Sequence, residues 1–192
     1  MTDDVVKFFQ KGAYNQAGGI FNHNQKEDND HRRFQWPFEM SPVICDFMQD
    51  LKRVIRQHAP GLDVHNWVAL YSAKGCQEQA VHADYDPNKQ GCPGLGVLVA
   101  LEDDTALYVW PGSHSMDWVN KKTLPVPIKK KTVLLDRGDL LVFHGHLLHA
   151  GAEYVKKSNT RLHCFVSSIA FDGRNTWLLS SAPKHIQDSI AV

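Results

Sequence analysis

The sequence has 192 residues, of which 43% are hydrophobic and 22% are charged, and its 21 basic side chains balance its 21 acidic ones. A chain of this length can fold around a core of its own, so we expect one domain that spans residues 1–192. The net charge of zero gives no strong sign of a nucleic-acid-binding protein, and no run of about eighteen apolar residues is present to cross a bilayer.

The cysteines and the first residues of the chain indicate a location inside the cell. Cys45, Cys76, Cys92 and Cys164 lie far apart and form no CxxC pair, which is typical of proteins in a reducing compartment. The opening MTDDVVKFFQKG carries acidic residues where a signal peptide has basic ones. We therefore expect a soluble intracellular protein, in the cytoplasm rather than the nucleus.

Residues 1–62 are predicted to form a helical and irregular lead-in that packs on the rest of the chain. Apolar side chains recur every three or four positions from Ile44 to Ile55, which predicts one amphipathic helix. Ser41 offers an N-cap oxygen, Pro42 suits the first helical position, and the segment 59–61, Ala-Pro-Gly, ends the helix.

The stretch before this helix, residues 13–40, is rich in Asn, Gln, Gly and charged residues. Such a composition is typical of an exposed loop. We expect its histidines, His23 and His31, to be solvated loop residues rather than ligands.

From Asp63 onward, short β-type runs alternate with Gly, Pro, Asn and Asp, which predicts a mainly β fold. About eight strands at this spacing indicate a sandwich or barrel of jelly-roll type in residues 63–170, flanked by helix and followed by a C-terminal extension, residues 171–192. The predicted strands are Val64–Ser72, Gln77–Ala83, Gly96–Leu101, Ala106–Trp110, Thr132–Leu135, Leu140–Phe143, Leu148–Val155 and Arg161–Ala170.

Two segments of the strand region carry groups that bind metals. His82 and Asp84 lie two residues apart in VHADY, so on an extended strand both side chains point to the same face. A third ligand is predicted 67 residues later, at His149, where the Gly-Asp turn of RGDLLVFHGHLLHAG feeds a buried strand that ends in histidine. His144 and His146 remain alternatives, because a bulge at Gly145 can reset the register.

Two imidazoles and one carboxylate leave adjacent coordination positions of an iron ion open for a chelating co-substrate and dioxygen. Arg161 follows His149 by 12 residues, at the start of the next predicted strand, where an antiparallel return places its guanidinium beside the metal. A guanidinium binds a carboxylate through two parallel hydrogen bonds, as the remote end of 2-oxoglutarate requires. His163 alternates with Arg161, so it is predicted either to line the same pocket or to be a core histidine.

In this order, HADY, GDLLVFHGHLLHAG and NTRLH resemble the double-stranded β-helix of the iron(II)- and 2-oxoglutarate-dependent oxygenases. The segment 109–114, VWPGSH, is similar to the Pro-Gly-Ser-His segment of their phytanoyl-CoA hydroxylase-like branch. This resemblance implies that His82, Asp84 and His149 bind Fe(II) and that Arg161 binds the distal carboxylate of 2-oxoglutarate. Tyr71 in YSAKG is similar to a co-substrate-contacting tyrosine of prolyl-hydroxylase-like members, although the spacing here is longer.

The resemblance implies an Fe(II)- and 2-oxoglutarate-dependent dioxygenase that consumes O2 and releases succinate and CO2 while it hydroxylates or oxidatively demethylates a substrate. Ascorbate is a candidate supporting reductant. The substrate classes left open are small molecules, lipid esters, protein side chains and nucleobases, and the sequence does not indicate an oligomeric state. The alternatives are a cupin-like metal enzyme without 2-oxoglutarate, in which Arg161 would lack a purpose, and a non-catalytic β-barrel binding module.

Overall fold

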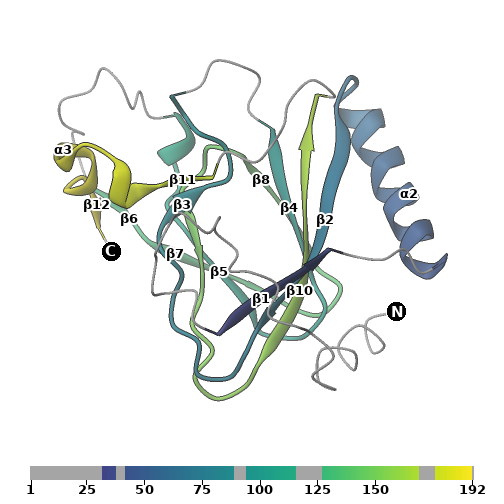
Figure 1. Cartoon of the computed structure of the whole chain (residues 1–192). Coiled ribbons are helices and arrows are strands. Elements are labelled where there is room, and N and C mark those ends of the chain that lie inside the picture. The colour runs from purple at the N-terminus through teal and green to yellow at the C-terminus, as the bar shows by residue number, and fades with distance from the viewer. Residues whose placement is uncertain (1–31, 38–41, 89–93, 116–126, 169–175, 192) are drawn as a thin grey trace.

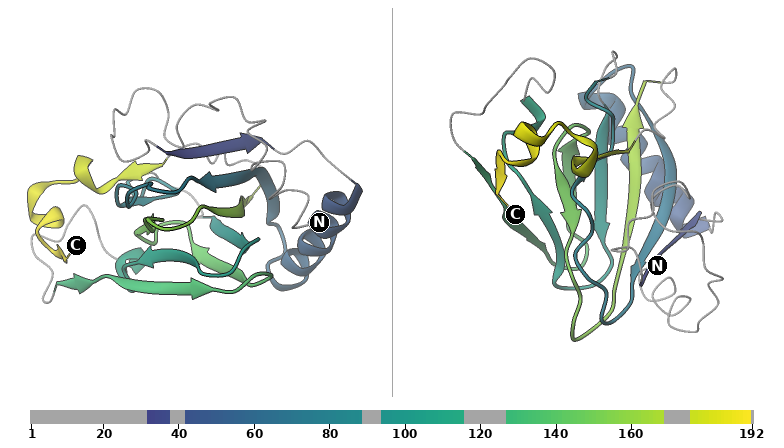
Figure 2. Two further views of the ribbon diagram at one scale, coloured as in Figure 1. Left: turned by 90° about the horizontal axis from the view of Figure 1, so that it is seen from below. Right: turned by 60° about the vertical axis from the view of Figure 1, so that its left-hand side comes forward.

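The computed structural model of the chain describes residues 32–37, 42–88, 94–115, 127–168 and 176–191. Most of its strands belong to two five-stranded sheets that face each other (Figures 1 and 2). The first sheet has the order β1-β2-β10-β4-β8, and the second has the order β11-β3-β9-β5-β7. Consecutive strands from β2 onward tend to alternate between the sheets, which is the winding expected of the predicted jelly roll.

The first sheet consists of β1 (Arg33–Pro37), β2 (Asp63–Ser72), β10 (Asn159–Ser167), β4 (Leu95–Ala100) and β8 (Leu140–His144). The second sheet consists of β11 (Trp177–Leu178), β3 (His82–Ala83), β9 (His149–Gly151), β5 (Thr105–Val109) and β7 (Lys131–Leu135). All strand pairs inside both sheets are antiparallel.

The remaining elements flank these sheets. Helix α2 (Pro42–His58) lies along the outer face of the first sheet, next to β2 (Figure 1). The short elements are η2 (Ser113–Ser115), η3 (Leu179–Ser181), α3 (Lys184–Gln187) and the parallel pair of β6 (Ile128–Lys129) and β12 (Ile190–Ala191). In the described ranges, no helix is long and apolar enough to span a bilayer.

Three buried clusters hold these layers together. The first lies between α2 and the first sheet, and Leu51 and Ile55 are its helical members. The second joins β3 and β9 to the C-terminal elements through Trp110 and Ile186. The third draws on both sheets and fills the space between them; its buried members are Leu98, Ala100, Leu107, Val109, Leu135 and Phe143. Because apolar side chains fill most of this space, polar side chains there need a specific reason.

Several sequence predictions agree with this fold. The mainly β architecture with a flanking helix is confirmed, and α2 begins at Pro42, the predicted first helical position. Ser41, the predicted N-cap, lies outside the described residues, as do His23 and His31.

Three local predictions were wrong. Residues 33–37, expected in an exposed loop, form β1, which pairs with β2 from Arg33 opposite Ser72 to Pro37 opposite Val68. The strand that feeds His149 is not a buried one. Strand β8 lies at a sheet edge with Leu140 and Val142 exposed, and it ends at His144 before a turn leads to β9 in the other sheet. Strands β3 and β9 are also shorter than predicted.

Candidate metal centre and co-substrate pocket

His82 and His149 lie side by side on two adjacent strands of the second sheet. They are directly opposite each other in the antiparallel pair of β3 and β9, and their ring centroids lie 4.2 Å apart. Asp84 follows β3 in a bend and turns back toward them, so that its Oδ1 lies 3.6 Å from His149 Nε2. All three side chains are buried. The two sequence segments thus converge as predicted, although they come from strands far apart in the chain.

Backbone carbonyls orient both imidazoles. His82 Nδ1 lies 2.8 Å from the carbonyl oxygen of Ala80, and His149 Nδ1 lies 2.9 Å from that of Leu147. A carbonyl oxygen only accepts hydrogen bonds, so Nδ1 is the protonated nitrogen of each ring and Nε2 carries the lone pair. This is the usual arrangement behind a metal-binding histidine, in which the second ring nitrogen donates to an acceptor.

Burial and proximity set the protonation states of the three groups. Burial lowers the pKa of His82 to about 3, and His149 acts in the same direction. Burial also lowers the pKa of His149. Burial alone would raise the pKa of Asp84, but His149 and His163 outweigh it and hold that pKa at about 2. At neutral pH the imidazoles are therefore neutral and the carboxylate is ionised, as metal ligands must be.

The three residues fit a metal ion. Their ligand atoms lie within 4.8 Å of one another, so one ion can reach all three, and they are the one such group found among the residues the structure describes. Asp84 Oδ2 is buried and, among the described residues, makes no well-formed hydrogen bond; His163 Nε2 lies 3.5 Å from it. An unsatisfied buried carboxylate oxygen is costly, and coordination to a cation would relieve it.

Arg161 and His163 face this group from the first sheet. They alternate on β10 with Leu162 and Cys164, which pack in the cluster under α2, so they point into the space between the sheets. His163 Nε2 lies 3.5 Å from Asp84 Oδ2, at the outer limit of a hydrogen bond. His163 therefore lines the site, which answers the question that the sequence left open.

Arg161 is almost completely buried, with 1% of its surface exposed. Its Nη1 donates to Ser72 Oγ at 3.0 Å, while its Nε has no hydrogen-bond partner among the described residues. A buried cation that lacks a full set of acceptors is unfavourable. The side chain is thus prepared for an anionic ligand, and its charge is close enough to contribute to the lowered pKa of His149.

Two glycines provide the room that this arrangement needs. A β-carbon at position 96 would lie 2.7 Å from Asp84 Oδ2 and closer still to the Phe143 ring. A β-carbon at position 151 would lie 2.9 Å from Arg161 Nη2. Sequence reasoning missed both positions, although a glycine inside a predicted strand is a known sign of close approach. Phe143 packs against His149 and His163 with ring centroids at 4.8 and 6.2 Å and closes the site on that side.

The other candidates from the sequence lie elsewhere. His144 and His146 contact each other at a ring separation of 5.3 Å, and His144 contacts His114 at 5.2 Å; the structure does not bring them into the group around Asp84. Tyr71 lies on the opposite face of β2 from Ser72, packs against the cluster under α2 and stacks on Phe34. The structure therefore does not bring Tyr71 together with Arg161.

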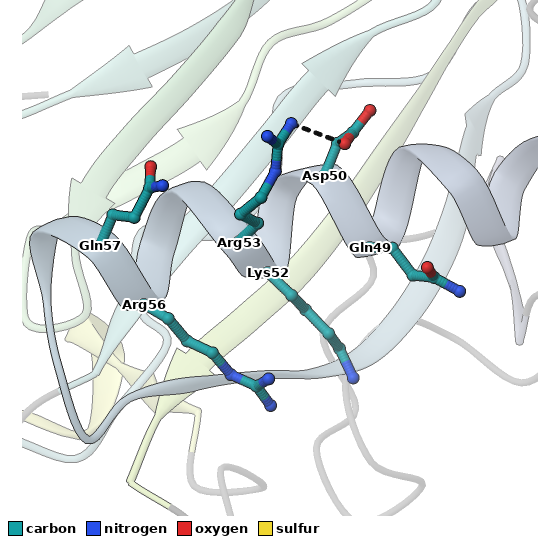
Figure 3. Close-up of a pocket in the computed structure, with 6 residues that line it drawn as sticks. All are labelled: Gln49, Asp50, Lys52, Arg53, Arg56 and Gln57. Carbon is teal, nitrogen blue, oxygen red and sulfur yellow. Dashed lines mark hydrogen bonds and ion pairs between the residues drawn. The ribbon is translucent and has the colours of Figure 1, made fainter.

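A surface hollow lies along α2 and is lined by Gln49, Asp50, Lys52, Arg53, Arg56 and Gln57 (Figure 3). All six residues come from this one helix, and several are already paired: Arg53 with Asp50, and Arg56 and Lys52 with Asp63. None of them belongs to the buried group between the sheets. The hollow is therefore not part of the candidate metal centre.

Comparisons with solved structures establish the fold. HygX from Streptomyces hygroscopicus, crystallised with nickel and 2-oxoglutarate, is 17% identical over 89% of this chain and 80% of its own, with a TM-score of 0.61. AviO1 from Streptomyces viridochromogenes is 16% identical over 88% of this chain and 80% of its own, with a TM-score of 0.62. The epimerase SnoN, in complex with Fe3+, alpha ketoglutarate and nogalamycin RO, is 16% identical over 99% of this chain and 79% of its own, with a TM-score of 0.54.

A comparison with curated protein sequences finds no match. Protein-family profiles do give one: residues 3–158 match phytanoyl-CoA dioxygenase (PhyH). This range includes the segments that contain His82, Asp84 and His149, and it extends to within three residues of Arg161. The chain therefore belongs to the phytanoyl-CoA dioxygenase family, which confirms the predicted class of enzyme, a non-haem iron oxygenase that depends on 2-oxoglutarate.

Proposed function

We propose that His82, Asp84 and His149 bind the iron(II) of this enzyme and that Arg161 binds the distal carboxylate of 2-oxoglutarate. The observation that carries the proposal is the convergence of three buried residues, from β3, the bend after it and β9, that face a buried arginine on β10. Both imidazoles can coordinate the metal through Nε2, because each Nδ1 donates a hydrogen bond to a backbone carbonyl oxygen. The ligand set leaves coordination positions for a chelating 2-oxo acid and dioxygen.

The spacing along β9 supports the role of Arg161. His149 and Gly151 point to the same face of this strand, and Arg161 Nη2 lies over Gly151. Two residues of a strand cover roughly 7 Å, a span that a five-carbon dicarboxylate can bridge with its 2-oxo acid end at the metal and its other carboxylate at the guanidinium. Ser72 holds Nη1 of Arg161, and Nε remains available for the carboxylate.

When bound, iron(II) supplies the activation of dioxygen, and 2-oxoglutarate supplies two electrons as it is converted to succinate and CO2. The residues of the chain do the rest. The carbonyls of Ala80 and Leu147 fix the imidazole rings, and Phe143 covers one side of His149 and limits the access of water. Arg161 orients the co-substrate by its remote carboxylate.

The substrate that this proposal favours is a small molecule, which the enzyme hydroxylates or oxidatively demethylates. Support comes from similar structures: HygX has been crystallised with hygromycin B bound, and SnoN comes from nogalamycin biosynthesis. SnoN is described as an epimerase, so epimerisation is a second candidate outcome. Mass spectrometry of product formed under labelled dioxygen separates them, because hydroxylation adds one labelled oxygen atom and epimerisation leaves the mass unchanged.

The first experiment is an anaerobic titration with iron(II), with and without 2-oxoglutarate, that records the weak visible charge-transfer band of a chelated 2-oxo acid. We expect the band only when both are present. His82→Ala should abolish it by removing the metal, and Arg161→Ala should weaken it by raising the Kd for 2-oxoglutarate. His146→Ala is the matched control and should match the wild type. If iron(II) binds but no band forms, 2-oxoglutarate is not the co-substrate and the cupin-like alternative is favoured. If no metal binds, the non-catalytic binding module is favoured.

A further inference from the structure

Arg33 is a second buried arginine beside the proposed co-substrate pocket. It begins β1, in the segment that composition alone assigns to an exposed loop, yet only 2% of its surface is exposed. Its Nη2 donates to the carbonyl oxygens of Gln77, Gly151 and Ala152 at 2.6, 3.1 and 2.6 Å. Arg33 thus reaches from β1 in the first sheet to the end of β9 in the second. A buried cation with this many backbone partners is held in one position.

Arg33 and Arg161 share one acceptor. Arg33 Nη1 donates to Ser72 Oγ at 2.8 Å, and Arg161 Nη1 donates to the same oxygen at 3.0 Å. Register places Ser72 opposite Arg33 in β1 and opposite Asn159, two residues before Arg161, in β10. Two guanidinium groups therefore converge on one buried hydroxyl. Like charges this close repel each other strongly in a medium of low dielectric constant, and an anion between them would relieve the repulsion.

Gly151 defines the place where the two arginines meet. A β-carbon there would lie 2.9 Å from Arg33 Nη1 and 2.9 Å from Arg161 Nη2. Both groups consequently lie over the face of β9 that also carries His149, two residues before Gly151. The two guanidinium groups therefore form the positively charged end of the proposed pocket. Strand β9, which carries both His149 and Gly151, sets the distance between this end and the proposed metal ligands.

We propose that Arg33 is a positioning residue for the co-substrate: through Ser72 it fixes the Arg161 guanidinium, and with its own charge it makes this pocket select a 2-oxo acid that carries a second carboxylate. This inference rests on the proposed function and adds a residue from β1. Arg161 keeps Nε for the carboxylate because the shared hydroxyl holds its Nη1. A 2-oxo acid of the same length without the distal carboxylate would gain nothing from either arginine.

The test compares two ligands of equal chain length, 2-oxoglutarate and 2-oxopentanoate, by anaerobic titration of the iron(II)-loaded full chain. Arg33→Met retains most of the side-chain volume and removes every donor. We expect it to raise the Kd for 2-oxoglutarate by about 10- to 100-fold, as the loss of a hydrogen-bonded charge does. The Kd for 2-oxopentanoate and the Kd for iron(II) alone should stay at the wild-type values. Equal losses for both acids would mean general damage to the fold and would overturn the proposal.

Two further variants separate positioning from folding. Ser72→Ala removes the shared oxygen and leaves the three carbonyl contacts of Arg33 in place, so it should reproduce the selective loss even if Arg33→Met does not fold. Arg32→Met is the matched control, because Arg32 is exposed and donates to the carbonyl oxygen of Lys74, away from Arg161. It should bind both acids as the wild type does. Unchanged selectivity in Ser72→Ala would contradict the proposal.

A double-mutant cycle with Arg161→Met provides the final check. Because Arg33 acts partly through Arg161, the double variant should lose less 2-oxoglutarate affinity than the sum of the losses in the two single variants. Fully additive losses would overturn the coupling. A wild-type protein that shows no charge-transfer band with 2-oxoglutarate refutes the proposed function itself, whereas a wild-type band together with wild-type affinity in Arg33→Met refutes this inference alone.

Discussion

His82 and His149 lie directly opposite each other in the antiparallel pair of β3 and β9, 67 residues apart in sequence and 4.2 Å apart between ring centroids. Neither strand is longer than three residues, so this pairing places the two imidazoles rather than forming an extended ladder. The position of each Nε2 follows from the backbone of the same strand region, through the carbonyls of Ala80 and Leu147.

The assignment of the third ligand can be tested directly. We expect His149→Ala to abolish high-affinity binding of iron(II), because the remaining pair, His82 and Asp84, leaves the ion with too few protein ligands. His144→Ala and His146→Ala should bind iron(II) with the wild-type Kd in anaerobic calorimetry, since both side chains lie outside the group around Asp84. Loss of binding in either of these controls, with binding retained in His149→Ala, would reassign the ligand.

The free energy of unfolding of the metal-free protein should fall as the pH drops below about 6.5. The folded pKa of His82 is lowered to about 3, so between these values the unfolded chain binds a proton that the folded chain does not. In this pH range, each group with such a lowered pKa reduces the free energy of unfolding by up to about 1.4 kcal/mol for every unit that the pH falls. Asp84, with a folded pKa of about 2, adds a further loss below the ordinary pKa of an aspartate.

Urea unfolding of chelator-treated protein between pH 8 and pH 4.5 measures this dependence. His82→Asn should show a smaller slope of the unfolding free energy against pH than the wild type. The same substitution at the exposed His58 of α2 is the control. An identical slope in wild type and His82→Asn would mean that His82 does not hold its lowered pKa in the folded protein.

His163 should orient Asp84. Its Nε2 is 3.5 Å from Asp84 Oδ2, and it is held between Phe143 and Phe165. Removing such a supporting side chain typically weakens metal binding by about 10- to 100-fold, so His163→Phe should raise the Kd for iron(II) by this order. His163→Gln keeps a donor and should recover much of the affinity. Wild-type affinity in His163→Phe would show that the contact is incidental.

Gly151→Ala should block the co-substrate pocket without emptying the proposed metal site. The new methyl group would overlap with Gln79 Oε1 and would lie 2.9 Å from a guanidinium nitrogen of both Arg33 and Arg161, so these side chains must shift. We expect the Kd for 2-oxoglutarate to rise by more than about tenfold, as expected when a charged hydrogen bond is lost, while iron(II) binding is retained.

Gly138→Ala is the control for this substitution. Gly138 has a φ of +96° and open space around its Cα, so an alanine there strains the turn between β7 and β8 without filling any pocket. It should lower the Tm and leave both affinities unchanged. If it also weakened 2-oxoglutarate binding, the effect of Gly151→Ala would be attributable to stability alone.

The sequence by itself determined the mainly β fold and the start of α2 at Pro42, and it predicted the residues of the candidate site. His82 and Asp84 lie two residues apart, and the order His-x-Asp, His, Arg along the chain can be recognised without a folded structure. His163 could also be placed beside Arg161, because alternation along a strand is a property of the local backbone.

The tertiary structure decided which histidine faces Asp84 and what surrounds Arg161. The run from Leu140 to His149 looks continuous in sequence, yet β8 and β9 belong to different sheets, so strand parity could not choose between His144, His146 and His149. Tyr71 has a suitable side chain but faces the cluster under α2.

Arg33 shows this limit most clearly. The residues that precede it in sequence, 24–32, are all polar or charged. Its burial depends on Ser72, Gly151 and Ala152, which lie 39 to 119 positions away. Contacts over such separations arise only when the two sheets come together, because burial of a charged side chain becomes favourable only where distant carbonyl and hydroxyl groups are already assembled to accept its hydrogen bonds.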